Sequence, residues 1–483
     1  MNMSTALNNA LGGLTAASRG AAVVSENIAN ALTPGYARRS LELATNTISG
    51  HGVRTVGVIR HQDPVLTSNR RATDADLAFH TTISDFHTRL ESLVGSADDP
   101  ASLSVRLADF DSSLLTVASL PDSSERLDQV ARTAQDLARG LNAASEGLRQ
   151  MRSDADRSIG KQVDTLNQTL KDIEELNAKI PAIKYSGADI GGILDQRQVL
   201  IDQVNELVPV NVIQRDNDQV SLYSDGGLIL LENTAAEFSF STTGDTKPHM
   251  TLANGLLSGL EMNGNTVRTS GDFAQIRGGA LMAQFQIRDE IAVEAQVDLD
   301  AVARDLIERF ETPGLDPTAL ATDPGVFTDD GNRFDPASVT GLASRISLNA
   351  IVDPDAGGES WKLRAGLGAA TPGSAGDASQ LRAFSSILND ERPVSGAVFG
   401  AGNMPAADIS EALLSRIGSD AHVADGRRVF ANSANLEMMA IEAEQGVDTD
   451  QELQRLMQIE QAYAANARLV SVVDELMDTL LRL

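Results

Sequence analysis

The chain has 483 residues, 39 of them basic and 67 acidic, so its formal charge is −28. This length allows about three domains, and the excess of acid argues against binding nucleic acid or an anionic membrane surface, since Lys and Arg supply most of that binding. The sequence contains no cysteine, which excludes disulfides, thiolate metal sites and a cysteine nucleophile. No apolar run reaches the roughly 20 residues that a membrane helix needs.

The N-terminal segment predicts a helix with one apolar stripe. Apolar side chains recur at alternating spacings of three and four, the pattern of a coiled-coil seam: Leu7, Ala10, Leu14, Ala17, Ala21, Val24, Ile28 and Ala31. Polar residues interrupt the segment, so it lacks the solid apolar centre of a cleaved signal peptide. We expect either a cytoplasmic protein or one exported by a route without a cleaved signal.

Shorter elements follow this first helix. Pro34 and Gly35 are expected to end it, because Pro disfavours helical geometry at the residue before it and Gly permits a turn. Residues 50–60 predict one or two short extended segments. Residues 65–94 and 100–120 each predict a helix.

The longest predicted helix covers residues 121–181. Asp122 and Glu125 resemble a capping box at its start, and Pro181 is expected to end it. Three internal glycines lower the expectation that it is unbroken.

A second, shorter helix is predicted from Ile193 to Val208, after which the apolar period changes from 3.6 to 2. Residues 210–212 and 220–222 are expected to pair as a hairpin, and the polar stretch up to residue 271 predicts a small β subdomain.

The last part of the chain returns to helix after one irregular region. Residues 279–310 predict a helix, and residues 312–376, rich in Pro, Gly and Asp, predict an irregular or β-rich insertion. Thr449 and Glu452 resemble a capping box in front of a second apolar stripe: Leu456, Ile459, Tyr463, Asn466, Val470, Val473, Met477 and Leu480.

These elements predict a mainly α fold with β-rich insertions, in a nested arrangement that pairs the N- and C-terminal helices like a coiled coil. Four domains are expected: a terminal paired-helix domain of 1–45 and 435–483, a long helical bundle of 46–208, 272–311 and 377–434, a β subdomain of 209–271 and the insertion of 312–376. We define the assembly seam as the large apolar residues of both terminal stripes together with the neighbouring Leu11: Leu7, Leu11, Leu14, Val24, Ile28, Leu456, Ile459, Tyr463, Val470, Val473, Met477 and Leu480. Isolated helices of this length are marginal in water, so we hypothesise that both ends fold only on assembly. Asn466 is either a solvated edge residue or a buried polar residue that fixes helix register.

Motifs at both ends resemble those of bacterial flagellar axial proteins. The N-terminal motif contains Asn27, Asn30, Pro34, Gly35 and Tyr36, and the C-terminal motif contains Asn466 and Arg468 within residues 461–470. Within that group, the interior run Leu194, Asp195, Gln196 and Arg197 is similar to a helix of the flagellar hook-associated protein 1 family. The resemblance covers about residues 1–310 and 430–483.

The resemblance implies a structural, non-enzymatic protein without cofactors. Family members form a ring of identical subunits between the flagellar hook and filament, which implies as partners the hook protein and a second junction protein on the filament side. It also implies export through the flagellar export apparatus after a transient cytoplasmic stage in which a chaperone holds the C-terminal helix. Its final location would be the secreted flagellum.

Two alternatives remain open from the sequence. Another flagellar axial protein, of hook or rod type, shares the terminal motifs, and a hydrolase could be carried on residues 312–376. Asp195, Gln196 and Arg197 follow one another on a helix and therefore point in different directions, so we expect a polar surface with one or two salt bridges and not a catalytic cluster. His80 and His87 are spaced too widely to hold one metal ion without other ligands.

Overall fold

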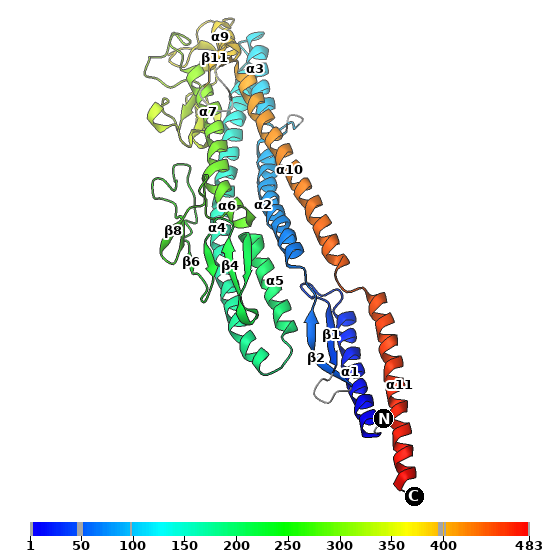
Figure 1. The fold of residues 1–483 in the computed structure, drawn as a ribbon. Helices are drawn as coiled ribbons and strands as arrows, with labels where there is room; N and C mark the ends of the chain where they lie inside the picture. The colour runs from blue at the N-terminus through cyan, green and yellow to red at the C-terminus, as the bar shows by residue number, and fades with distance from the viewer. Residues whose placement is uncertain (1–2, 46–51, 97–98, 395–398, 400–401, 482–483) are drawn as a thin grey trace.

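The computed structural model describes residues 3–45, 52–96, 99–394, 399 and 402–481, except the side chain of Leu480. The molecule is a long rod, and both ends of the described chain lie at the same tip (Figure 1). The N- and C-terminal helices lie side by side there, which confirms the nested arrangement.

Helices make up most of the described chain. Two pairs of consecutive helices are connected by only a few residues of irregular geometry. A π-helical turn at Ile287–Ile291 joins α6 to α7, and Gln445–Asp448 separates α10 from α11. The helices are α1 Met3–Ala29, α2 Pro64–Val94, α3 Leu103–Ala118, α4 Ser124–Tyr185, α5 Gly191–Leu207, α6 Gly279–Gln286, α7 Ala292–Phe310, α8 Lys362–Ala365, α9 Ser379–Asn389, α10 Ala406–Glu444 and α11 Thr449–Leu481.

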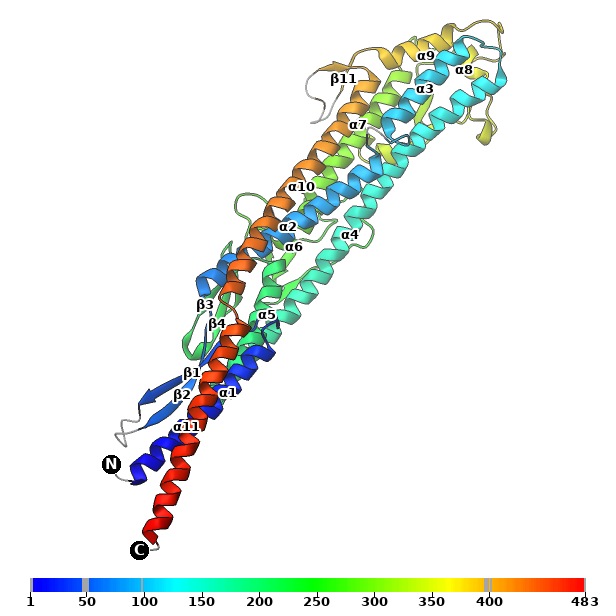
Figure 2. The ribbon, with the colours of Figure 1, turned by 90° about the vertical axis from the view of Figure 1, so that its right-hand side faces the viewer.

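Helix α4 runs along one side of the rod (Figure 2). Its 62 residues form one continuous helix, roughly 93 Å long at 1.5 Å per residue. The predicted capping box is wrong by one position, because the Ser123 hydroxyl accepts the Arg126 amide.

The predicted end of α4 at Pro181 is also wrong. A proline removes the hydrogen bond to the carbonyl four residues earlier. Here the side chain of Gln219 donates to that carbonyl, on Asn177, at 3.1 Å. The helix therefore continues to Tyr185 with this acceptor satisfied.

The upper half of the rod is a bundle of α2, α3, α4, α7 and α10 around one core. Aromatic rings from different elements meet edge to face at its centre, where the Phe110 and Phe327 ring centroids are 5.5 Å apart and those of Phe310 and Phe384 5.4 Å apart. Residues 312–376 contribute to this core through Phe327, Ile346 and Leu363. The predicted insertion is thus mostly irregular chain fixed onto the bundle.

The strands form small antiparallel sheets beside the helices (Figure 1). The predicted hairpin is confirmed, with Val212 opposite Leu222. The strand from residue 39 to 45 was not predicted; it pairs with the predicted strand 53–60. The strands are β1 Arg39–Thr45, β2 Val53–Arg60, β3 Val210–Gln214, β4 Val220–Ser224, β5 Ile229–Leu231, β6 Phe238–Ser239, β7 Leu260–Met262, β8 Asn265–Val267, β9 Phe327–Asp329, β10 Ile346–Leu348, β11 Arg392–Pro393 and β12 Asn403–Met404.

Buried polar side chains hold the small sheets against α4. Asp156 of α4 pairs with Arg288 at 2.9 Å and accepts the backbone N–H of Thr243 at 2.6 Å. Arg152, one turn earlier, donates to the carbonyl of Met250 at 2.6 Å. These charge-assisted bonds satisfy loop backbone that would otherwise be buried without partners.

Helix α10 runs without interruption through residue 435, where the boundary between bundle and terminal domain was expected. The chain turns after Glu444, and Asp448 accepts the backbone N–H groups of Asp450 and Gln451 at 2.9 and 3.1 Å. The predicted capping box at Thr449 and Glu452 is therefore wrong, since Asp448 caps α11. The side chain of Glu452 contacts Asn27 of α1 instead.

Candidate functional site: the terminal helix pair and its elbow

Helices α1 and α11 pack antiparallel in a fixed register. Contacts recur every seven residues along both helices, and the two residue numbers of each pair add up to 479, as in an antiparallel coiled coil. The pairs are Gly13 with Asn466, Gly20 with Ile459 and Asn27 with Glu452. A small residue of α1 thus faces a larger one of α11 in two successive layers.

The inner face of α1 consists mainly of small residues. Its buried positions are Ala10, Ala16, Ala17, Gly20, Val23, Val24 and Asn27. Gly13 and Gly20 permit the close approach, because a Cβ atom on either would lie 2.6 Å from the amide of Asn466 or 3.2 Å from Ile459 Cδ1.

The residues of the assembly seam lie in three environments. Val24 and Val473 are buried; Leu11, Tyr463 and Met477 are exposed; and Leu7, Leu14, Ile28, Leu456, Ile459 and Val470 are half-buried. The side chain of Leu480 lies outside the described residues. Of these eleven described seam residues, three therefore remain exposed in one subunit: Leu11, Tyr463 and Met477.

A second apolar stripe on α11, which was not predicted from the sequence, runs beside the face that meets α1. Leu469, Val472 and Leu476 are 50–53% exposed and recur at spacings of three and four. Exposed large apolar side chains in a row mark surfaces that associate with other proteins.

The base of the helix pair meets the bundle through a group of buried and half-buried polar residues, which we call the elbow cluster: Asn27, Tyr36, Arg38, Arg39, Arg60, Asp195 and Glu452. They come from α1, the following loop, β1, β2, α5 and α11. The cluster unites residues more than 400 positions apart in the sequence.

Asn27 is the centre of the cluster and is fully buried. Its Oδ1 accepts the Tyr36 hydroxyl at 2.8 Å and the Arg39 amide at 2.9 Å; its Nδ2 donates to the Arg39 carbonyl at 2.8 Å and to Glu452 Oε2 at 3.1 Å. Burial is the main cause that raises the pKa of Tyr36, so its hydroxyl remains a donor.

Asp195 connects the cluster to α5. It accepts Arg39 Nη2 and Arg60 Nε at 2.7 Å each, and the backbone N–H of Ala37 at 3.3 Å. A buried carboxylate is destabilising unless charged partners compensate it, and here the two guanidinium groups do so. Asp195 therefore joins α5 to β1 and β2.

Arg197 lies two residues further along α5 and is also buried. Its Nη1 donates to Asn177 Oδ1 at 2.9 Å and to the Asp218 carbonyl at 2.6 Å. Burial, and secondly the charge of Arg60, lower its pKa to about 10. The expected polar helix surface is therefore wrong for Asp195 and Arg197, which are buried, but holds for Gln196, which is exposed; the expected ion pairs are present at Asp195.

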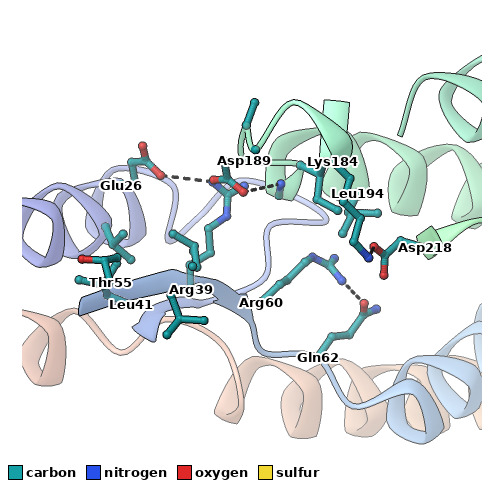
Figure 3. Close-up of a pocket in the computed structure, with 18 of the residues that line it drawn as sticks. Glu26, Arg39, Leu41, Thr55, Arg60, Gln62, Lys184, Asp189, Leu194 and Asp218 are labelled. Atoms are coloured by element: carbon teal, nitrogen blue, oxygen red, sulfur yellow. Dashed lines mark hydrogen bonds and ion pairs between the residues drawn. The ribbon is translucent and has the colours of Figure 1, made fainter. Parts of the chain in front are cut away.

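An open cleft of about 940 Å³ lies beside the elbow cluster. Figure 3 shows Arg39, Arg60 and Lys184 around it, with Glu26 and Asp189 next to Arg39. Its walls come from α1, the β1–β2 hairpin and the turn between α4 and α5. The cleft therefore separates the terminal pair from the bundle on this side.

The other motif residues lie around this centre. Gly35 has φ +76°, and a Cβ there would lie 2.5 Å from Val199 Cγ2 of α5, so the turn requires glycine. Asn30 donates to the Glu26 carbonyl. Pro34, Gln196 and Arg468 are exposed, and Leu194 is half-buried.

Asn466 is half-buried over Gly13, and its Nδ2 donates to the carbonyl of Ala462 at 2.9 Å. It lies on the contact line with α1, yet its amide bonds within its own helix. Asn466 thus lies at the edge of the helix pair, and its role in fixing register stays a prediction.

A second ion-pair group lies where α2, α5 and α10 meet. Arg70 pairs with Asp202 and Glu442 at 2.6 Å each, and Arg71 pairs with Asp202 at 2.7 Å. These contacts hold the lower end of α10 against the bundle. They fix the point from which α11 departs.

No group of three or more His, Asp or Glu side chains suited to a metal ion occurs among the described residues. Within the same part of the chain, no helix is long and apolar enough to cross a membrane. His87 is half-buried, and desolvation is the main cause that lowers its pKa.

Comparisons with known proteins agree with this arrangement. Residues 87–314 match the model of the "Flagellar hook-associated protein FlgK helical domain". Flagellar hook-associated protein 1 of Bacillus subtilis is 22% identical and aligns over 98% of this chain and 96% of its own length. The chain belongs to the flagellar hook-associated protein 1 family. It is accordingly a structural protein of the flagellum and not an enzyme.

Further matches divide the chain into ends and interior. Residues 7–36 match the model "Flagella basal body rod protein" and residues 443–483 match "Flagellar basal body rod FlgEFG protein C-terminal". Flagellar hook-associated protein 1 of Salmonella typhimurium is 29% identical over 48% of this chain and 44% of its own length. The solved structure of the flagellar hook junction protein FlgK from Burkholderia pseudomallei aligns with 55% of this chain and 46% of its own at 18% identity, with a TM-score of 0.45.

Proposed function

We propose that this chain is the subunit that joins the flagellar hook to the filament, and that its terminal pair α1–α11 builds the inner tube of the junction. The observation that carries the proposal is the second apolar stripe on α11. Leu469, Val472 and Leu476 stay half exposed beside the face of α11 that α1 covers. A further helix packed on this stripe would bury the exposed half of each side chain and so gain about half of the roughly 1.5 to 3 kcal/mol that full burial of a large apolar residue contributes.

The partners follow from this position in the flagellum. Copies of this chain form a ring, the hook protein lies on one side of the ring, and a second junction protein lies on the filament side. Because the two neighbours differ, the contacts are heterologous and repeat around a helical lattice. The four domains of the chain, as bounded above, divide into this inner pair and the outer bundle with its small sheets.

Assembly requires that the chain reach the growing tip. We infer that the flagellar export apparatus carries it out of the cytoplasm without a cleaved signal, and that a cytoplasmic chaperone covers α11 before export. The exposed stripe on α11 supports this role of the chaperone, since an uncovered apolar helix would aggregate.

Deleting the gene tests the junction. We expect cells with complete hooks, no filaments and filament subunit lost to the medium, and we expect the full chain to restore filaments while a chain without residues 449–483 does not. Normal filaments in the deletion strain would contradict the proposal.

A further inference from the structure

We propose that Asn27, Arg38 and Glu452 form a register clamp that selects one of several possible alignments of α1 with α11. The seam between these helices discriminates poorly between alignments. Gly13 and Gly20 are one heptad apart, and each receives a larger residue of α11. A slip of seven residues, roughly 10.5 Å along the helix, again places a glycine under a larger side chain.

The other small residues strengthen this ambiguity. Ala10 and Ala17 are also one heptad apart, and both are buried. A side chain of α11 that packs between alanines and glycines of α1 is surrounded by nearly the same shape before and after the slip. The shape of the α1 face is therefore insufficient to specify the alignment.

The clamp lies where the repeat of small residues ends. The carboxylate of Glu452 is 1% exposed. Its Oε2 accepts Asn27 Nδ2 at 3.1 Å and its Oε1 accepts Arg38 Nε at 2.9 Å. Arg455, one turn further, donates to the same Oε1 at 3.3 Å.

A slip in either direction breaks the clamp. If α11 shifts so that Glu452 lies opposite Gly20, its carboxylate faces the small apolar side of α1 with neither Asn27 nor Arg38 in reach. If it shifts the other way, Ile459 lies opposite Asn27 and Glu452 lies beyond the end of α1 at Ala29. A buried polar group that loses its partner is costly, and this cost specifies register in helix pairs.

The inference deepens the proposed function, because a tube built from terminal pairs requires every pair to have the same alignment. It also assigns a role to the N-terminal motif. Tyr36 and the Arg39 backbone occupy Asn27 Oδ1 and thereby aim Nδ2 at Glu452. Glu452 acts as a positioning residue and not as a contact to another subunit.

Disulfide crosslinks between introduced cysteines report the alignment directly, because the chain has no cysteine of its own. Ala17 and Ala462 line the same groove between α1, β1 and α11, and their numbers also add up to 479. The substitutions Ala17→Cys and Ala462→Cys therefore report the native alignment. Ala10→Cys or Val24→Cys with Ala462→Cys report slips of one heptad in the two directions.

The full-length chain is oxidised under dilute conditions, and the intramolecular crosslinks are counted by mass spectrometry. With Glu452 intact, we expect the native pair to dominate. Glu452→Leu is expected to lower the ratio of native to slipped crosslinks by at least about tenfold, since it removes the only charged partner of Asn27 in the helix pair. An unchanged ratio in Glu452→Leu would overturn the proposal.

Two further variants separate loss of register from loss of folding. Asn27→Asp places two carboxylates together and is expected to lower the ratio. Adding Glu452→Gln restores a donor and an acceptor in exchanged positions and is expected to raise the ratio again. If Glu452→Leu removes every crosslink, the comparison of Asn27→Asp with the double variant tests the clamp instead. Failure of the double variant to recover the native crosslink would then contradict the clamp.

Glu460→Gln is the matched control, because Glu460 lies exposed on the same helix, and it should leave the ratio unchanged. The measurement uses the isolated chain and does not depend on filament assembly. If Glu452→Leu changes the crosslink ratio but the gene deletion leaves filaments intact, the proposed function alone is overturned. If the deletion removes filaments but Glu452→Leu leaves the ratio unchanged, the clamp alone is overturned.

Discussion

The side chain of Asn466 lies so close to Gly13 that a Cβ atom on the glycine would be 2.6 Å from Asn466 Nδ2. Glycine inside a helix normally weakens it. Here the cost is offset by the approach of α11, so the glycine serves the pairing of the helices.

Gly13→Ala is therefore expected to weaken the α1–α11 pair, although alanine favours helix by about 1 kcal/mol over glycine. The measurement is amide hydrogen exchange of α1 and α11. Gly426→Ala is the control, because Gly426 is exposed on α10 and no atom lies within 4 Å of the added Cβ; it should stabilise its helix. Slower exchange of α1 in Gly13→Ala would contradict the expectation.

Removing the carboxylate of Asp195 should loosen the elbow. In Asp195→Ala, Arg39 and Arg60 lose their shared partner while remaining largely buried, which costs about 3–5 kcal/mol. Denaturant unfolding measures the cost. Gln196→Ala, at the next and exposed position of α5, should change stability by less than about 0.5 kcal/mol, and equal effects of both substitutions would show that the cluster contributes little.

The helices and the pairing of the chain ends could be predicted from the sequence, because both depend on periodic apolar residues within short windows. The elbow cluster could not. Its bonds join Asn27 to Glu452 across 425 positions, and Glu452 was interpreted as the last residue of a capping box. The one available signal was its place in the seam, since position 452 is one heptad before Ile459.

Local rules failed where a distant residue supplied the missing partner. Pro181 is an ordinary stop signal, yet the helix continues through it, and Gln219 from the hairpin supplies the donor that the Asn177 carbonyl loses. Asp195 and Arg197 occur in a polar run typical of a surface, but partners from β1, β2, α4 and the turn between β3 and β4 enclose them. Such partners depend on the tertiary fold, which the sequence pattern does not specify residue by residue.

The outer stripe of α11 should be needed for assembly and not for the fold of one subunit. Val472→Lys places a charge in the stripe, and we expect an unchanged circular dichroism spectrum but no filaments. Ala464→Lys adds the same charge at an exposed position away from both apolar stripes and should allow filaments. Filament growth with Val472→Lys would mean that this stripe is not an interface.

Asp298 of α7 predicts a dependence of stability on pH. Burial is the main cause that raises its pKa to about 6, against the opposing charge of Arg416. Because the folded state binds this proton more tightly than the unfolded state does, ionisation of Asp298 costs stability as pH rises from about 4 to about 6, and the cost is complete above that range.

Asp298→Asn should therefore stabilise the chain at pH 7, by about 1 kcal/mol after allowance for its partial exposure, and the gain should vanish near pH 4. Denaturant midpoints at both pH values measure it. Asp76→Asn, at an exposed carboxylate of α2, serves as control. A gain that is equal at both pH values would contradict the assignment to ionisation.

The terminal helices should be the least protected part of an isolated subunit. Large seam residues of α11 such as Tyr463 and Met477 are about half exposed, whereas the α4 residues Leu141 and Leu170 are fully buried. In a verified monomer, amides of α1 and α11 should exchange at least about a hundredfold faster than those around the two leucines, because local opening there breaks few buried contacts. The assembled ring should slow their exchange, since neighbouring subunits then cover the seam. Equal protection of α1, α11 and α4 in the monomer would show that the pair is already stable before assembly.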